Sequence, residues 1–224
     1  MISQEAFNLI MGTIAPDIEA RDSEIYSSLG LIESAKVPGK HPRVLSILSS
    51  LLERSVQKNE KLLETMDKKD TITIFHGLRA PGLSIRQYID RIYKYSSCSP
   101  SCFVVAYIYI ERFIQRKDFH LTSLNVHRLV ITSVMAAAKF IDDAFFNNAY
   151  YAKVGGVSTA EMNRLEMKFL LSLDYRLHVT VSTFDWYCLQ LEKESGGGYQ
   201  IERPIQILIL ACKVFQKKIS DTTS

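Results

Sequence analysis

Three charged residues stand among apolar neighbours, and their side chains are of types that bind the main chain of another protein. Lys139 follows three alanines, Glu111 follows the run AYIYI, and Glu166 lies between Met162 and Phe169. A buried ammonium without a partner costs several kcal/mol, so Lys139 must either reach solvent or meet an acceptor. An ammonium donates to backbone carbonyls and a carboxylate accepts from backbone N–H groups. Together these groups would form a polar docking site for a second polypeptide.

A plainer interpretation is that each charge lies at the rim of a bundle, with its stem packed and its head in water. For a single lysine in a helix, that interpretation is favoured. Three such charges, Glu111, Lys139 and Glu166, fall on three different apolar segments. Their number weakens the plainer interpretation and favours one shared polar patch whose groups are best satisfied once a partner covers it.

The elements that must position these charges are helices, because apolar residues recur at helical spacing and strand signals are nearly absent. Residues 100–116 are apolar on most faces, as is the helix expected from about Thr122 through the LVITSVMAAAKFIDD stretch, and this requires burial on most sides. We therefore predict an all-α fold with about five central helices between Ser84 and Glu194. Further helices are expected at residues 3–10, within 41–64 and from Pro204 onwards, with an irregular stretch before Gly39 and an extended connector at TITIF.

Helix starts are marked by capping residues. A side-chain oxygen at the N-cap accepts a free backbone N–H of the first turn, and a Glu or Gln three residues later can reach back. Pro at the first helical position is also typical. The predicted starts are Ser84 with Gln87, Ser99 with Pro100, Thr122, Ser158 with Glu161, and Ser182 with Asp185; Gly155 ends the short helix before Ser158, and the SGGG linker at Ser195 ends the helix from Ser182.

Composition narrows the class of protein. The chain has 224 residues, 47% of them hydrophobic, and a net charge of +3, which is weak for a nucleic-acid-binding domain. No apolar run approaches the roughly 20 residues of a membrane span, and the N-terminus lacks the basic region of a signal peptide. Four cysteines, including Cys98 and Cys102 four residues apart, indicate buried thiols in a reducing compartment rather than a zinc or disulfide role. We expect an intracellular protein.

An enzymatic function is disfavoured by the absence of catalytic motifs. Asp142 and Asp143 suggest a metal pair, but no histidine stands at a metal-binding spacing, and His127 is expected on a helix surface. The VGG run reads as a turn between helices rather than a phosphate loop. The five histidines, scattered along the chain, are His41, His76, His120, His127 and His178. No cofactor, metal or small-molecule substrate is expected.

Three segments, YIYIERFI, MAAAKFIDD and MNRLEMKFLLSLDYRL, resemble the cyclin box in their order and spacing. The longer pattern around RAPGLSIRQYIDRIYKYS and NNAYYAKVGGV is similar to the plant P-type cyclins, also called U-type. That group is similar to the yeast cyclin of phosphate signalling. The resemblance implies a single five-helix cyclin box at residues 71–194, between an N-terminal helical extension (1–70) and a C-terminal linker and helix (195–224).

The resemblance also implies a function and a set of residues. The protein is expected to bind and activate a cyclin-dependent serine/threonine kinase by docking on its C-helix, in the nucleus or the cytoplasm. Lys139 and Glu166 fall on the family's kinase-clamping pair, with Phe140, Phe145 and Phe169 as apolar contacts. Arg86 and Glu111 fall on an internal charge pair that joins the first two box helices.

The sequence departs from the pattern of cell-cycle cyclins in two places. Ile141 replaces the first glutamate after the lysine–phenylalanine pair. The candidate substrate-docking patch carries no tryptophan, so we do not expect it to recruit the same substrate motif; it consists of Ile85, Tyr88, Ile89 and Ile92. Two alternatives to kinase regulation remain, a cyclin-fold transcription adaptor and a helical peptide-binding scaffold.

Overall fold

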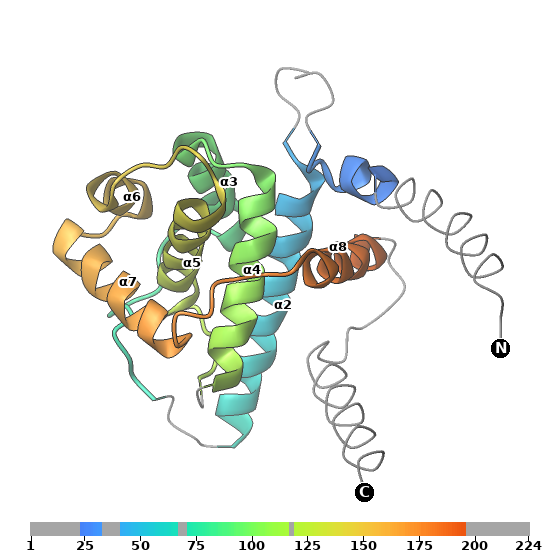
Figure 1. Cartoon of the computed structure of the whole chain (residues 1–224). Helices are drawn as coiled ribbons and strands as arrows, with labels where there is room; N and C mark the ends of the chain where they lie inside the picture. Colours follow the sequence, from blue (N-terminus) through green and yellow to red (C-terminus); the bar gives the residue numbers. More distant parts are fainter. Residues whose placement is uncertain (1–22, 33–40, 67–70, 117–118, 196–224) are drawn as a thin grey trace, which may run out of the picture. The chain divides into compact units, whose positions relative to one another are not determined.

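The computed structural model describes residues 23–32, 41–66, 71–116 and 119–195, and within these ranges the only regular elements are helices (Figure 1). The predicted all-α fold class is confirmed. The chain divides into two units, Met1–Glu192 and Lys193–Ser224, and the following description concerns the first. The helices expected at residues 3–10 and from Pro204 lie outside the described residues. The division of the chain at residues 70 and 194 stays a prediction.

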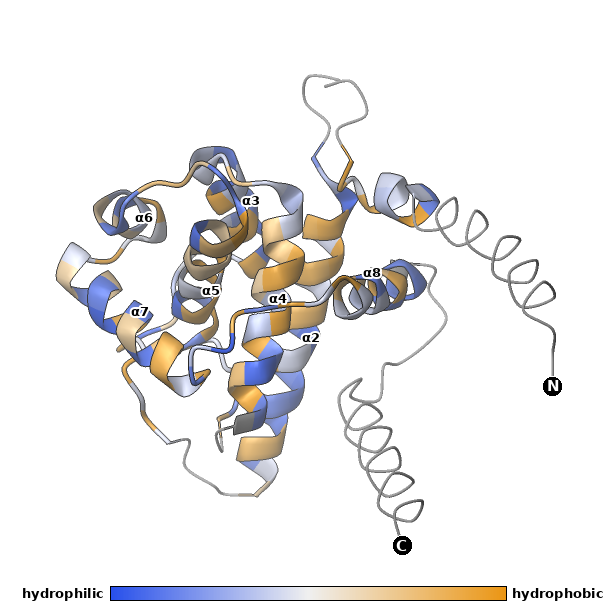
Figure 2. Ribbon diagram, in the orientation of Figure 1, coloured by the Kyte–Doolittle hydropathy of each residue, from blue (hydrophilic) through white to orange (hydrophobic). Residues whose placement is uncertain are grey.

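Five helices form the box. They are α3 (Ile85–Ser96), α4 (Pro100–Arg116), α5 (Val126–Ile141), α6 (Asn148–Gly155) and α7 (Thr159–Ser172). The central helix is α5, which contacts each of the other four. Its sequence explains this position, since every residue from Val126 to Ala138 except Arg128 is buried. In Figure 2 the apolar colouring runs along α4 and α5, as expected for helices enclosed by others.

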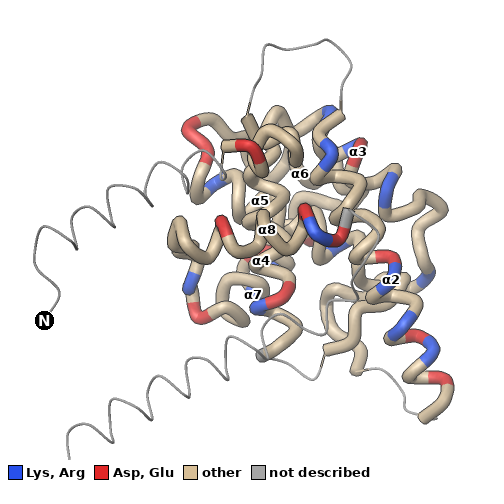
Figure 3. The backbone as a smooth tube through the Cα atoms, turned by 90° about the vertical axis from the view of Figure 1, so that its right-hand side faces the viewer, with Lys and Arg blue, Asp and Glu red and all other residues tan. Residues whose placement is uncertain are grey.

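Two further helices flank the box. α2 (Arg43–Thr65) packs on α3 and α4, and α8 (Val181–Ser195) follows the box. Along α2, basic and acidic residues alternate on the exposed face (Figure 3). Its apolar stripe, which includes Val44, Leu48 and Leu52, is buried as predicted.

The stretch before Gly39 was expected to be irregular, and this was wrong for residues 23–29, which are helical. Tertiary contacts stabilise this short helix. Leu29 is fully buried, and the hydroxyl of Tyr26 donates to the Asp185 carboxylate of α8. The Tyr26 ring also packs edge-on against Phe184. Local helix propensity does not reveal a stabilising contact with a residue about 160 positions away in the sequence, so this helix was not predicted.

The predicted caps hold in part. Ser84 and Gln87 form a complete capping box at α3. At α7, Ser158 accepts from the Glu161 N–H, but the Glu161 side chain pairs with Arg128 of α5 instead of reaching back. Two starts were misplaced: α5 begins at Val126 rather than near Thr122, and Thr180 rather than Ser182 caps α8.

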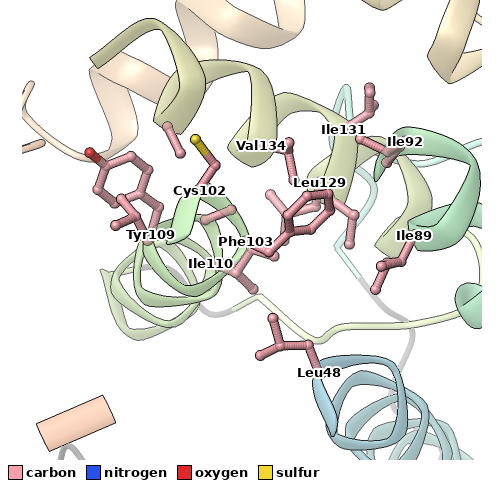
Figure 4. Packing of buried hydrophobic residues seen from close by; sticks show 14 of the residues in the cluster. Leu48, Ile89, Ile92, Cys102, Phe103, Tyr109, Ile110, Leu129, Ile131 and Val134 are labelled. Carbon is pink, nitrogen blue, oxygen red and sulfur yellow. The ribbon is translucent and has the colours of Figure 1, made fainter. Parts of the chain in front are cut away.

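The core joins residues far apart in the sequence (Figure 4). Ile89, Phe103 and Leu129, from α3, α4 and α5, are at most 2% exposed. A second group of rings joins α4 to α7, where Phe169 stacks on Phe113 at 5.5 Å between ring centroids. Phe75 and Phe119 pack edge-on against Phe113. The connector at TITIF is thus anchored by the Phe75 ring; it contains no strand, but it was predicted to be extended and instead ends in a turn, in which the His76 N–H donates to the Thr73 carbonyl at 3.0 Å.

Asp142, which suggested a metal ligand, instead caps a helix. Its carboxylate accepts from the Ser99 N–H at 2.9 Å, from the Ser99 hydroxyl at 2.8 Å and from the Cys102 thiol at 3.0 Å. The N-terminus of α4 favours a negative charge there, because the helix dipole and its free N–H groups face the carboxylate. The Ser99 hydroxyl therefore donates to Asp142 instead of accepting a backbone N–H of its own helix.

Candidate functional site: a polar clamp at the edge of α5 and α7

Lys139 and Glu166 meet at the surface between α5 and α7. The Lys139 Nζ lies 2.7 Å from the Glu166 Oε1, and the two side chains are 27% and 18% exposed. The sequence predicted that both charges would stand together at the border of the bundle, and their positions agree. Lys139 is in the last turn of α5, where a cation also interacts favourably with the helix dipole.

Asn148, at the start of α6, joins the pair from a third helix. Its Oδ1 accepts a hydrogen bond from Lys139, and its Nδ2 donates to the Glu166 Oε2 at 2.7 Å and to the Asn163 Oδ1 at 2.8 Å. The Asn147 side chain caps α6 by accepting from the Tyr150 N–H, which fixes where Asn148 projects. Asn148 was not among the site residues predicted from the sequence, although it lies in the NNAYYAKVGGV segment that carries part of the resemblance.

The clamp formed by Lys139, Glu166 and Asn148 keeps unused hydrogen-bonding capacity. An ammonium has three N–H donors, and among the described residues Lys139 uses two. Each oxygen of the Glu166 carboxylate receives one hydrogen bond and has room for another. The clamp therefore presents one donor and one acceptor of opposite charge side by side at a partly exposed edge.

Exposed apolar side chains lie on α5, on the segment that follows it and on α7, the elements next to the clamp. Phe140 and Phe145 are 49% and 53% exposed, which suits the contact role expected for them. Met167 and Leu171, on the outer face of α7, are 57% and 52% exposed and line a shallow hollow of about 330 Å³. Met167 and Leu171 were not predicted from the sequence as site residues. The contact role of Phe169 is wrong, because this ring is fully buried in the phenylalanine cluster.

The candidate substrate-docking patch is also buried. Its four side chains are no more than 8% exposed because they form the inner face of α3, against α5 and α6. Tyr88 hydrogen bonds the Gly155 carbonyl at 3.0 Å and stacks edge-on with His127. These side chains stabilise the core and offer no docking surface; they are Ile85, Tyr88, Ile89 and Ile92.

The internal pair expected between Arg86 and Glu111 does not form. Arg86 pairs with Asp90 one turn further along α3, at 2.9 Å. The Glu111 carboxylate accepts from the Tyr187 hydroxyl of α8 at 2.8 Å. Glu111 therefore joins α4 to α8, and its burial raises the pKa of its carboxyl group against the opposing effect of hydrogen bonds from Tyr187 and Tyr107.

Replacing Glu111 by glutamine is expected to raise the free energy of unfolding at neutral pH by on the order of 0.5–1 kcal/mol. The raised pKa means that the folded protein binds this proton more tightly than the unfolded chain. Stability is therefore lost as pH rises from the ordinary glutamate pKa through the folded value. A neutral amide keeps the acceptor for Tyr187 and removes that loss. Urea unfolding of both proteins at pH 4 to 8 checks this, and an equally steep pH profile in the variant would contradict it.

No metal site is found among the residues that the structure describes. No group of three or more histidine, cysteine, aspartate or glutamate side chains in these ranges is placed to bind a metal ion. His127 was expected on a helix surface and is instead buried, with its Nε2 at 2.9 Å from the Leu83 carbonyl oxygen. Of the helices described, none combines the length and hydrophobicity needed to cross a bilayer.

A bundle of five helices with α5 at its centre is consistent with a cyclin box. The family model for cyclins matches residues 41–177, and the chain belongs to the cyclin family. Among its relatives, it is 58% identical to Cyclin-P3-1 of Oryza sativa subsp. japonica over 198 residues, 88% of this chain and 84% of that protein. It is 50% identical to Cyclin-U3-1 of Arabidopsis thaliana over 213 residues, 95% and 96% of the two chains.

These likenesses confirm the predicted resemblance to plant P-type and U-type cyclins. Cyclins are generally non-catalytic, and membership supports a regulatory role towards a cyclin-dependent kinase.

Proposed function

We propose that this protein binds a cyclin-dependent kinase through the edge of α5 and α7 and activates it by docking on the kinase C-helix. The observation that carries this proposal is the clamp of Lys139, Glu166 and Asn148, a charged pair with spare hydrogen-bonding capacity between exposed aromatic side chains. Such a partner places the protein inside the cell, in the nucleus or the cytoplasm.

The clamp suits a segment of main chain. Lys139 donates its remaining N–H to a backbone carbonyl, and Glu166 accepts a backbone N–H, so one extended segment of the kinase satisfies both. Asn148 already holds the two charges in place, so little side-chain entropy is lost on binding. The charges fix the register of the kinase, and the surrounding apolar surface supplies most of the affinity.

Activation follows from a difference in affinity. Kinase catalysis requires an ion pair between the strand β3 lysine and the C-helix glutamate, together with an ordered activation loop. A free kinase of this class populates an arrangement in which these parts are not in place. A partner that binds only the active arrangement shifts the population by its differential affinity, which must reach about 5.5 kcal/mol to turn a 1:99 mixture into 99:1.

Replacing Phe140 and Phe145 together by alanine is expected to weaken kinase binding about tenfold to 100-fold, because each exposed ring would be buried in the complex. Folding should hardly change, since both rings are half exposed in the free protein. Titration calorimetry against a purified kinase gives the affinity. The matched control is Tyr175→Ala, which removes a ring that is 58% exposed just after α7 and outside the clamp, and which should bind normally. Equal loss in both variants would contradict the assignment.

The function itself is tested with the unmodified protein. The full chain is purified with an affinity tag from a plant extract, and the eluate is assayed for a cyclin-dependent kinase and its activity. We expect a kinase of this class to be recovered, and the recombinant pair to phosphorylate a peptide far faster than the kinase alone. Recovery without activation, or salt-sensitive DNA binding without any kinase, would overturn the proposal.

A further inference from the structure

The segment between α7 and α8 is fixed to α4 through its main chain. This segment crosses α4 in Figure 1, and three successive carbonyl groups in it accept hydrogen bonds from α4 side chains. Arg112 donates from its Nη1 to the carbonyls of Arg176 at 3.0 Å and of His178 at 3.1 Å. Tyr109 donates from its hydroxyl to the carbonyl of Leu177 at 2.7 Å. Leu177 packs against the core, and the side chains of Arg176 and His178 on either side of it are exposed.

A hollow of about 320 Å³ lies where this segment meets α4, and we call it the arginine hollow. Arg112 and Arg176 contribute guanidinium groups to its lining. Gln115 and His178 contribute further N–H donors, and Leu173 forms an apolar wall. Within the described ranges, no carboxylate forms an ion pair with either arginine. The arginine hollow therefore complements an anion.

Arg112 is already oriented for such a ligand. Its Nη1 is fixed by the two carbonyls, and its guanidinium carbon lies 6.0 Å from the centre of the Tyr109 ring. A guanidinium has five N–H donors, and no described residue uses those on Nε and Nη2. The neighbouring acidic residues do not fill the hollow, because Glu111 accepts from the Tyr187 hydroxyl and Asp174 is not part of the lining. Two positive charges gathered there repel each other until an anion neutralises them.

We propose that the arginine hollow binds the phosphate monoester of a phosphorylated serine or threonine in another protein. The planar guanidinium groups of Arg112 and Arg176 match phosphate oxygens and bind them through paired hydrogen bonds. Leu173 faces the carbon atoms next to the phosphate. The choice of a phosphorylated protein segment rests on the proposed function, because a serine/threonine kinase held by the clamp produces this group on its substrates. The hollow then retains a protein that already carries one phosphate while the kinase adds another.

The experiment uses the purified full chain without any kinase. The probes are a fluorescein-labelled, alanine-rich peptide with one phosphothreonine and its unphosphorylated counterpart, and fluorescence anisotropy gives both affinities. We expect the phosphorylated peptide to bind about 30-fold more tightly or better, because only its phosphate can pair with both guanidinium groups. An excess of inorganic phosphate should displace it.

Variants at exposed positions locate the site without disturbing the fold. Arg176→Ala should weaken binding of the phosphorylated peptide about tenfold to 100-fold, and Arg176→Lys, which keeps the charge but not the planar fork, should fall between this variant and the wild type. The matched control is Lys58→Ala, which removes one exposed cation from α2 and should bind within about twofold of the wild type.

Three results would overturn the proposal. Equal affinity for the two peptides would exclude phosphate recognition, and an equal loss in Arg176→Ala and Lys58→Ala would show only general attraction between opposite charges. A phosphorylated peptide that binds no more tightly than inorganic phosphate would indicate a site for free phosphate and not for a protein segment. The arginine hollow shares no residue with the clamp, so Arg176→Ala should bind the kinase normally. A failure of the wild type to bind any kinase would therefore overturn the proposed function and leave the peptide result standing.

Discussion

Replacing Phe169 by alanine is expected to lower the free energy of unfolding by about 3–5 kcal/mol, the usual cost of emptying a buried phenylalanine site. Its ring is fully buried, stacked on Phe113 at 5.5 Å and edge-on to Phe75 at 6.4 Å. These rings tie α7 to α4 and to the connector before α3. The cavity would open where three segments meet, so the neighbours cannot collapse into it without moving a helix.

Urea unfolding followed by far-UV circular dichroism measures this loss. Phe169→Leu is the matched control, since it keeps most of the volume and should cost much less. Phe140→Ala, which removes a ring that is 49% exposed in the free protein, should cost almost nothing. If Phe169→Ala were as stable as the wild type and bound the kinase poorly, the ring would belong to the interface, contrary to its burial.

Replacing both Lys139 and Glu166 by alanine is expected to weaken kinase binding by about 2–5 kcal/mol, or roughly 30-fold or more. Each truncation leaves a backbone group of the kinase without its partner in the complex, and that desolvation cost is the main reason for the loss. The stability of the free protein should change by less than about 1 kcal/mol, because the pair is partly exposed and replaceable by water.

The matched control is the pair Arg128 and Glu161, which joins the same two helices with similar side-chain exposures of 27% and 25%. Arg128 and Glu161 are in the first turns of α5 and α7, whereas Lys139 is in the last turn of α5. The Arg128→Ala, Glu161→Ala double variant should bind the kinase within about twofold of the wild type after correction for any unfolded fraction. An equal loss in both double variants would show that binding reflects the packing of α5 on α7 rather than the clamp.

Much of the fold was predictable because the helices favoured by local sequence signals are also the helices that tertiary packing requires. The helices from α2 to α8 follow apolar spacing and capping residues, and the complete capping box at Ser84 illustrates this agreement. Where a predicted cap is incomplete although the helix start is right, a side chain of another element competes for the capping group. Glu161 turns to Arg128, and the Ser99 hydroxyl turns to Asp142.

The candidate site was predicted less completely. Lys139 and Glu166 were found because charges among apolar residues need a partner, but helical spacing shows only which residues share a face, not which face turns inward. Phe169 was therefore assigned to a surface, while Met167 and Leu171, two residues to either side, are the exposed ones. Asn148 carries no such signal, since a neutral amide near a helix start has an ordinary local role.

The pair of Arg86 and Glu111 that the resemblance implied does not form, and the reason is physical. Asp90 offers Arg86 an acceptor one helical turn away, at a lower entropic cost than a residue of another helix. Glu111 lies among the tyrosine hydroxyls of Tyr187 and Tyr107, which satisfy a buried carboxyl without a cation. Tyr107 lies one turn before Glu111 on α4, but only the contact of α8 with α4 brings Tyr187 to the same carboxylate.

Kinase binding as proposed requires that the clamp offers a donor and an acceptor to another polypeptide, and exchanging its two charges tests this directly. In the Lys139→Glu, Glu166→Lys variant the ion pair within the protein is preserved, and the Asn148 amide can turn to serve both. Only the polarity presented to the kinase is reversed. Calorimetric titration with a purified cyclin-dependent kinase should show binding weakened roughly 30-fold or more while the melting temperature stays close to the wild-type value. An affinity within about twofold of the wild type would mean that the pair serves only its own fold.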